Sequence, residues 1–472
     1  MRGGWRCALA LANALCMLAL SGARAEAADP PAALPCVLRA HVEPGSEEAA
    51  TVVFLTRIVN RGKTPLVSPW IHMHTPIELP HQTIHELEVD GKPKRLKDRW
   101  GSPVLAYRQE QLGPQATMSG RWAAWATIRR FRWELRRPPE TKEPAGPSVA
   151  SLAAEERKLY LRDAEPFSLK DPAVRTAAEQ AAAGRSGDAA ELDGIFGLVM
   201  ERLSYERDGK WQPVPEVLAS GKGSCSEYTY TFVALCRSRG IPARYVGGIV
   251  GRSGVPFHLD KVFHRFPQAL VAGIGWVDFD PTRTDRAKNK WLYFGRTPGP
   301  MLLTCVGDGG EGSLTGWDYL ESHAWKGPTS QAARIRVAWW FPPPPPETRK
   351  RVAEFRQGLA TTSGSKRSAL VEQALAIGHP FVLPWLDDLL YEPATRVAAA
   401  RACLKIGGKG DLAALVNCLG RLSDEADDRE IGRLLDEAGG QKLGADRRRW
   451  EDWLKAQTPR TPLPGDTPEK KP

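Results

Sequence analysis

Three residues of the types that cooperate in thiol chemistry follow one another along the middle of this 472-residue sequence: Cys225, His264 and Asp280. A cysteine thiolate is a strong nucleophile, an imidazole can take and return a proton, and a carboxylate can orient the imidazole and stabilise its charged form. Together they would catalyse acyl transfer through a thioester. Each residue alone has an ordinary structural explanation, such as core packing for the cysteine, so the prediction depends on all three meeting in space.

The residues around Cys225 predict that this cysteine begins a helix. Within residues 221–227, Gly-Lys-Gly-Ser-Cys-Ser-Glu, Ser224 and Glu227 have the spacing of a capping box with Ser224 as the N-cap. Gly240 is expected to end the helix. Cys225 would then be the first helical residue, where unpaired N–H groups and the helix dipole favour the thiolate over the thiol. The two glycines are expected to let a substrate backbone approach closely.

His264 and Asp280 are expected on two neighbouring strands. Strand-like residues follow His264, a glycine turn lies at 273–275, and a second short strand-like run ends at Asp280. Antiparallel pairing across this turn would bring the imidazole and the carboxylate together. The carboxylate could then hold the histidine in one tautomer.

Taken in order, these motifs resemble the core of the transglutaminase-like superfamily. The resemblance covers roughly residues 170 to 285 and consists of Gly-Lys-Gly-Ser-Cys225, the helix end Arg-Ser-Arg-Gly-Ile-Pro-Ala-Arg244, His264, and Trp276-Val-Asp-Phe-Asp280-Pro-Thr282. It implies a papain-like α+β core with Cys225 as nucleophile, His264 as base and Asp280 as the residue that orients the histidine.

The sequence departs from the family pattern just after the histidine, and it contains two rival residues. Arg265 and Phe266 stand where the family usually has a small residue and a tryptophan, and Phe266 keeps an aromatic ring there. His258 is a rival to the histidine, but its distance from the aspartate along the chain fits the family less well. Asp278 is a rival to Asp280, which the Asp-Pro-Thr context favours.

The segments on either side of this core predict a multidomain α+β protein. Residues 51–59 are rich in β-branched side chains, and Asp90-Gly91 is a hairpin-type turn after a strand. The expected organisation is a signal peptide at 1–25, a β-sandwich of immunoglobulin-like size at 30–137, a linker at 138–153, the transglutaminase-like catalytic domain at 154–341, a Pro-rich linker at 342–365, a helical domain at 366–458 and a disordered tail at 459–472.

The helical domain has a weak internal repeat. Ile377-Gly378, Ile406-Gly407 and Ala438-Gly439 are each expected to end a helix. Leucine- and alanine-rich helix pairs between them resemble HEAT repeats, which stack into an α-solenoid. A plain helical bundle remains an alternative.

The N-terminus predicts export. Arg2 and Arg6 precede an apolar run at 8–20, and Ala23-Arg24-Ala25 resembles a signal-peptide cleavage site. This run is shorter than the ~20 residues that span a bilayer, and no other stretch is long and apolar enough, so no transmembrane segment is expected after signal removal. The net charge of +10 would fall by three, to +7, because residues 1–25 hold three arginines and no acids. No basic run suggests nucleic-acid binding.

These observations predict a secreted or periplasmic thiol enzyme that acts on a protein or peptide substrate. An amine acceptor would give an isopeptide cross-link, whereas water would make the same site a cysteine protease or amidase. A third alternative is a non-catalytic scaffold that binds an envelope protein partner through its helical repeats. The chemistry requires no organic cofactor and no metal, and no acidic loop has EF-hand spacing.

Overall fold

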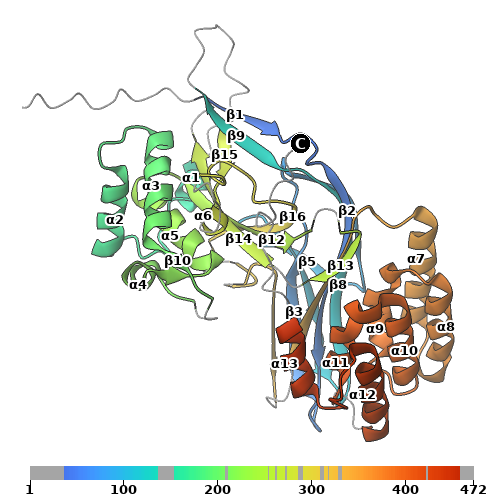
Figure 1. Cartoon of the computed structure of the whole chain (residues 1–472). Helices are drawn as coiled ribbons and strands as arrows, with labels where there is room; N and C mark the ends of the chain where they lie inside the picture. The colour runs from blue at the N-terminus through green and yellow to red at the C-terminus, as the bar shows by residue number, and fades with distance from the viewer. Residues whose placement is uncertain are drawn as a thin grey trace, which may run out of the picture.

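The structure is a computed structural model in which two helical regions flank a set of antiparallel sheets (Figure 1). It describes residues 37–136, 154–207, 211–252, 255–260, 263–271, 274–284, 291–308, 313–316, 318–327, 332–420 and 424–457. The expected signal peptide, the linker at 138–153 and the tail lie outside the described residues.

A five-stranded antiparallel sheet forms the middle layer of the molecule. Its strands are, in spatial order, β13 (Phe257–Asp260), β18 (Ala332–Trp340), β2 (Glu48–Val59), β8 (Thr117–Ile128) and β4 (Gln82–Val89). Residues 50–59 of the central strand are all buried. Because neighbouring residues of a strand point to opposite faces, this run means that both faces of the sheet are covered.

A second antiparallel sheet covers one of these faces. Its elements are β17 (Glu321–Lys326), β3 (Leu66–His74), β6 (Pro103–Arg108) and β5 (Lys94–Lys97), with β7 (Gln111–Leu112) paired to β3. Met73 and Leu105 of this sheet share one apolar core with Phe54, Trp122 and Trp339 of the first. A separate ribbon pairs β1 (Val37–Val42) with β9 (Phe131–Arg136).

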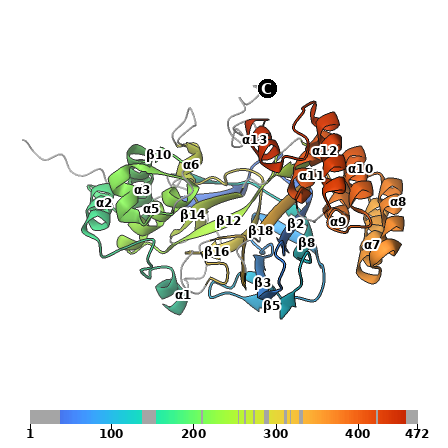
Figure 2. The same ribbon diagram turned by 90° about the horizontal axis from the view of Figure 1, so that it is seen from below.

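The C-terminal helices cover the opposite face of the five-stranded sheet (Figures 1 and 2). They are α7 (Pro346–Thr361), α8 (Ser368–Ile377), α9 (Leu383–Leu389), α10 (Arg396–Gly407), α11 (Leu412–Cys418), α12 (Glu425–Gly439) and α13 (Arg447–Gln457), with short 3-10 turns at Gly364–Arg367, Pro380–Val382 and Gly408–Asp411. Val53, Ala338 and Trp340 of the sheet belong to the same apolar core as these helices. The helical region is therefore packed onto the sheet along its length and is not a separate lobe.

Charged side chains tie the helices to the sheet at one point. Arg121 of β8 donates hydrogen bonds to Asp388 of α9 over 2.8 Å and to Asp90 over 2.6 Å, and Arg57 of β2 also pairs with Asp388. The indole N–H of Trp385 donates to Asp90 over 2.9 Å. The two arginine side chains are only 4% and 5% exposed, so this contact is a partly buried ion-pair network.

The segment with the candidate site forms a third sheet, covered on one side by helices. Its strands are, in spatial order, β15 (Gly275–Asp278), β14 (Phe263–Val271), β12 (Ala243–Val250) and β16 (Met301–Gly307). The associated helices are α1 (Ala154–Leu159), α2 (Pro172–Ala182), α3 (Asp188–Arg202), α4 (Val214–Ser220), α5 (Cys225–Ser238) and α6 (Pro281–Thr284). A short parallel pair joins β10 (Ser204–Tyr205) to β11 (Lys222–Gly223). Figure 2 shows α2, α3 and α5 on the side of the molecule away from α7–α13.

Two local expectations are corrected by the structure. Asp90-Gly91 does not form a hairpin, because β4 pairs with β8 in one sheet and β5 pairs with β6 in the other. The turn is present, with Gly91 at a φ of +74°, but it crosses between sheets. The expected Pro-rich linker at 342–365 contains α7, which starts with Pro346 in the first turn, where proline's missing N–H costs no helical hydrogen bond.

The expected boundary between the N-terminal region and the catalytic segment does not separate the sheets. The strands β13, β17 and β18 come from the 154–341 segment, yet each of them pairs with strands of the two N-terminal sheets. Strand pairing between segments far apart in sequence leaves no local pattern, so composition alone could not reveal it.

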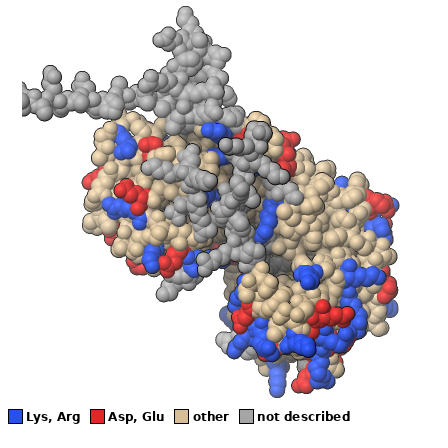
Figure 3. All heavy atoms as spheres, viewed as in Figure 1, with Lys and Arg blue, Asp and Glu red and all other residues tan. Residues whose placement is uncertain are grey.

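Two further observations concern the charges on the surface and the apolar character of the helices. Basic and acidic side chains lie close together on the face shown in Figure 3. Within the part of the chain that the structure describes, none of the helices has both the length and the apolar character needed to cross a membrane.

Candidate active site

Cys225 is the first residue of α5, as the capping box predicts. The N–H and the hydroxyl of Ser224 both donate to Glu227 Oε2, over 2.7 and 2.6 Å, and the Ser226 N–H donates back to Ser224 Oγ over 3.4 Å. This reciprocal cap fixes the first turn of the helix. The cysteine is partly exposed, and it sits where the helix dipole and unpaired N–H groups favour a negative charge.

The two glycines before Cys225 are explained by the chain itself. Gly221 ends α4 in the left-handed conformation, with a φ of +67°. A Cβ on Gly223 would lie 2.4 Å from the Cβ of Glu227, the capping residue. Close approach by a substrate is therefore not needed to account for either glycine.

His264 and Asp280 meet through the pairing of two strands. β14 and β15 are antiparallel, with Gln268 opposite Asp278, which confirms the predicted pairing of the strands, but β15 ends at Asp278 and Asp280 lies just beyond it. Nε2 of His264 lies 2.6 Å from Oδ2 of Asp280, and the two residues are 2% and 0% exposed. Asp280 also accepts the Arg283 N–H on Oδ1 over 3.1 Å, so the start of α6 holds the carboxylate in place.

The side chain of His264 is also hydrogen-bonded to that of Cys225. Because Nε2 is directed at Asp280, the ring nitrogen that remains for the sulfur is Nδ1. Thus one imidazole joins the thiol at the start of α5 to the carboxylate that lies just before α6. This is the order of contacts that a nucleophile, a base and an orienting group require.

The pKa values of His264 and Cys225 shift in opposite directions, and each shift favours the charged form of its side chain. Burial lowers the pKa of His264, but the negative charges of Asp280 and Cys225 outweigh it and raise the pKa to about 9. Burial raises the pKa of Cys225, but the hydrogen bond and positive charge of His264 outweigh it, so the pKa falls below its ordinary value. A thiolate and an imidazolium therefore stabilise one another.

The rival histidine and the rival aspartate lie elsewhere. His258 is on β13 of the five-stranded sheet, where its ring stacks on Trp339 and Phe341 with centroids 6.0 and 6.2 Å away. Asp278 is fully buried and accepts hydrogen bonds from Thr297 and Gln268, each over 2.8 Å; His81 Nε2 also lies 2.8 Å from its carboxylate. The ring contacts of His258 and the hydrogen bonds of Asp278 therefore differ from those of His264 and Asp280.

Arg265, noted in the sequence only as a departure from the family, lies inside the protein. It is 0% exposed, and its guanidinium carbon lies 4.4–5.0 Å from the centroids of four aromatic rings, those of Tyr319, Tyr245, Trp211 and Tyr230. We call these four residues the aromatic cage. Sequence reasoning missed it because its members come from four separate segments of the chain, and the only signal was an arginine within a predicted strand.

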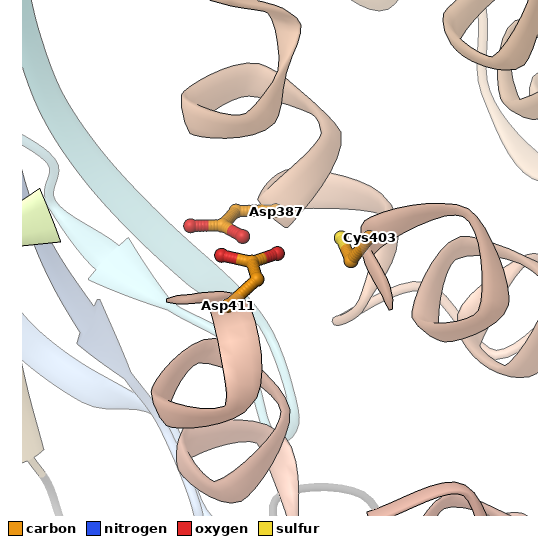
Figure 4. A group of neighbouring side chains, drawn as sticks. All are labelled: Asp387, Cys403 and Asp411. Atoms are coloured by element: carbon orange, nitrogen blue, oxygen red, sulfur yellow. The ribbon is translucent and has the colours of Figure 1, made fainter. Parts of the chain in front are cut away.

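One group of residues in the helical region has the chemistry of metal ligands. Asp387, Cys403 and Asp411 are buried, and one ligand atom of each lies within 4.8 Å of the others (Figure 4). It lies among the C-terminal helices and has no part in the triad. In the described residues Cys225, Cys236, Cys305, Cys403 and Cys418 are all free thiols.

Comparison with known proteins finds a family match for the central part of the chain. Residues 175–281 match the family model of the Transglutaminase-like superfamily, and this segment holds Cys225, His264 and Asp280. No curated protein matches the sequence.

Three solved structures show limited similarity. A "Putative Cysteine Protease" from Cytophaga hutchinsonii is 14% identical, with a TM-score of 0.43, and the match covers 64% of this chain and 100% of that one. The periplasmic domain of TgpA from Pseudomonas aeruginosa, bound to ethylmercury, is 15% identical, with a TM-score of 0.27, and covers 52% and 75%. A structure named a TGase is 11% identical, with a TM-score of 0.18, and covers 44% and 49%.

Three observations fall in the same stretch of chain. They are the order of the motifs, the helix that begins at Cys225 and the match of the family model. Residues 175–281 are a Transglutaminase-like superfamily domain.

Proposed function

We propose that the protein is an exported, thiol-dependent acyl transferase that acts on protein amides, with Cys225 as nucleophile, His264 as acid and base, and Asp280 as the group that orients His264. The observation that carries the proposal is the contact of the His264 imidazole with Asp280, 2.6 Å away, on one side and with the Cys225 thiol on the other. The transglutaminase-like domain at residues 175–281 supports it.

The first half of the reaction forms a thioester. The Cys225 thiolate attacks the carbonyl carbon of a substrate amide, and the negative oxygen that develops is stabilised by the Cys225 N–H at the start of α5. The C–N bond then breaks, while the His264 imidazolium gives its proton to the departing nitrogen as ammonia or an amine leaves. Asp280 keeps the imidazole aligned and stabilises its charged form.

The second half returns the enzyme to its starting state. His264, now neutral, takes a proton from an incoming amine as the amine attacks the thioester carbon. The C–S bond breaks, the thiolate re-forms beside the imidazolium, and a new amide is released. If a lysine amine attacks a glutamine-derived thioester, the product is an isopeptide cross-link; if water attacks, the same site acts as a cysteine protease or amidase.

The proposal also covers the location of the protein and the regions on either side of the transglutaminase-like domain. The signal-peptide pattern of residues 1–25 favours a secreted or periplasmic protein. We interpret the two N-terminal sheets as a β-sandwich and the C-terminal helices as HEAT-like repeats, whose face away from the sheet is a candidate surface for an envelope protein partner.

Comparison of the wild type with Cys225→Ala, after incubation with envelope proteins, tests the chemistry. Ammonia release and new isopeptides that depend on Cys225 would support cross-linking, and new peptide termini would support proteolysis. The matched control is Cys236→Ala, which removes a fully buried thiol from the same helix and should leave the products unchanged. If wild type and Cys225→Ala give identical products, the chain is a scaffold and the proposal is wrong.

A further inference from the structure

Trp211 has an unusual position for a large aromatic side chain. It is 45% exposed, and it is the one aromatic residue among the exposed large apolar side chains of the described residues. Its ring nevertheless packs against the buried guanidinium of Arg265, 4.7 Å from the ring centroid, and lies 6.3 Å from the ring of Tyr230. Trp211 is therefore held in place by cation–π and aromatic contacts while much of its surface stays open to solvent.

The aromatic cage links Trp211 to the reactive sulfur. Arg265 follows His264 directly, and its main-chain N–H is hydrogen-bonded to Cys225. Another cage residue, Tyr319, is close enough that burial and then the negative charge of Cys225 raise its pKa well above the ordinary value. Arg265 therefore links the two residues, because its guanidinium packs on Trp211 and its main chain interacts with Cys225.

Two other cage residues lie in the protein interior and pack around Arg265. Tyr230 lies on α5 and Tyr245 on β12, and their rings are 1% and 2% exposed. Gly247 leaves room for Tyr319, because a Cβ there would lie 2.6 Å from the tyrosine ring. Tyr319 is partly exposed, but Trp211, at 45%, is the most exposed member of the cage, so it is the ring that an incoming molecule would contact most readily.

We propose that Trp211 is a substrate-contacting residue, whose exposed ring provides a platform for an aromatic side chain next to the amide that Cys225 attacks, and that Arg265 is the positioning residue that holds this platform. The inference rests on the proposed function of Cys225. An indole face suits a flat apolar group, because stacked or edge-to-face rings gain more than their buried area alone provides.

Two alkylating reagents with the same reactive group test this platform without a known substrate. Iodoacetamide is too small to contact Trp211 and reports the reactivity of the thiolate, whereas N-benzyl-iodoacetamide adds one aromatic ring. For each thiol we take the rate with the benzyl reagent divided by the rate with iodoacetamide. We expect this ratio to be about three- to tenfold larger for Cys225 of the wild type than for a model thiol. Trp211→Ala should lose this preference and keep the iodoacetamide rate, and Trp211→Phe should retain most of the preference.

The matched control is Val67→Ala, which shortens an exposed apolar side chain on β3 and should keep the wild-type preference. Equal preferences in the wild type and Trp211→Ala would overturn the inference, and so would a Trp211→Ala variant that slows both reagents equally. Failure of the proposed function gives a different result: Cys225 would then react with iodoacetamide no faster than a model thiol, whatever the ratio of the two reagents.

Discussion

Nε2 of His264 and Oδ2 of Asp280 lie 2.6 Å apart in the protein interior. Since burial alone would lower the pKa of the imidazole, this carboxylate is the main reason that the pKa rises to about 9. The proposed reaction needs the imidazolium to protonate a leaving group. The contact therefore determines the highest pH at which the enzyme should be active.

Replacement of Asp280 by Asn should narrow the active pH range from the alkaline side. Without the carboxylate charge, only Cys225 would oppose the effect of burial on His264, so the pKa should fall from about 9 and the falling limb of the pH–rate profile should move to lower pH. We expect kcat to decrease by about 10²- to 10⁴-fold. Asp452→Asn, which changes an exposed carboxylate on α13, should leave the profile unchanged.

The reactivity of Cys225 should persist at a pH where an ordinary thiol is protonated. His264 lowers the pKa of Cys225 against the effect of burial, so the iodoacetamide rate of the wild type should rise at lower pH than that of a model thiol. In His264→Ala the thiol keeps its place at the start of α5 and loses the main charge that lowers its pKa, so the rise should move upward in pH. An unchanged profile in His264→Ala would contradict the proposed ion pair.

The ion-pair network at Asp388 should contribute to stability. Asp388→Ala would leave Arg57 and Arg121 without this carboxylate, and we expect the free energy of unfolding to fall by about 2–3 kcal/mol, less than for a fully buried pair because the Asp388 side chain is 28% exposed. Asp452→Ala should change it by less than about 0.5 kcal/mol. Urea unfolding of both variants measures the difference.

The same carboxylate predicts a dependence of stability on pH. Burial raises the pKa of Asp388, but Arg121 and Arg57 outweigh it and bring the pKa below its ordinary value of 3.8. The stabilisation should therefore be complete above the unfolded-state pKa and disappear as the pH falls through the lower folded-state pKa. Asp388→Ala should lack this part of the acid dependence.

Removal of the C-terminal helices should make the remaining chain aggregate. A chain that ends at Phe341 would expose Val53, Ala338 and Trp340 on one face of the five-stranded sheet, and large exposed apolar patches promote association. Light scattering at increasing concentration measures this. A chain that ends at Gln457, after α13, should remain monodisperse; equal behaviour of the two chains would show that the sheet does not need this cover.

The parts of the structure that could be predicted from sequence are those set by local chemistry. Ser224 and Glu227 determine the start of α5 through hydrogen bonds within one helical turn. The strands β14 and β15 are consecutive in the sequence, and their antiparallel pairing places Asp280 near His264. These two short-range features bring most of the candidate site together.

The features that sequence reasoning missed depend on contacts between distant segments. Nothing near β18 indicates that it pairs with β2, and nothing near Asp90 indicates that its carboxylate accepts a hydrogen bond from Trp385. The apolar run at residues 52–55, Val-Val-Phe-Leu, was a usable signal, since a strand without alternating polar residues is one that is covered on both faces. Arg265 gave no such signal, because its four aromatic neighbours come together only in the folded protein.

The position of β2 between β8 and β18 has a consequence for how the protein is made. A nascent chain emerges from its N-terminus, so one edge of β2 stays without its neighbour until the whole transglutaminase-like segment has followed. An unpaired apolar strand is an aggregation hazard. The five-stranded sheet can therefore close only after β18 has been synthesised, and its second face is covered only once the C-terminal helices have followed.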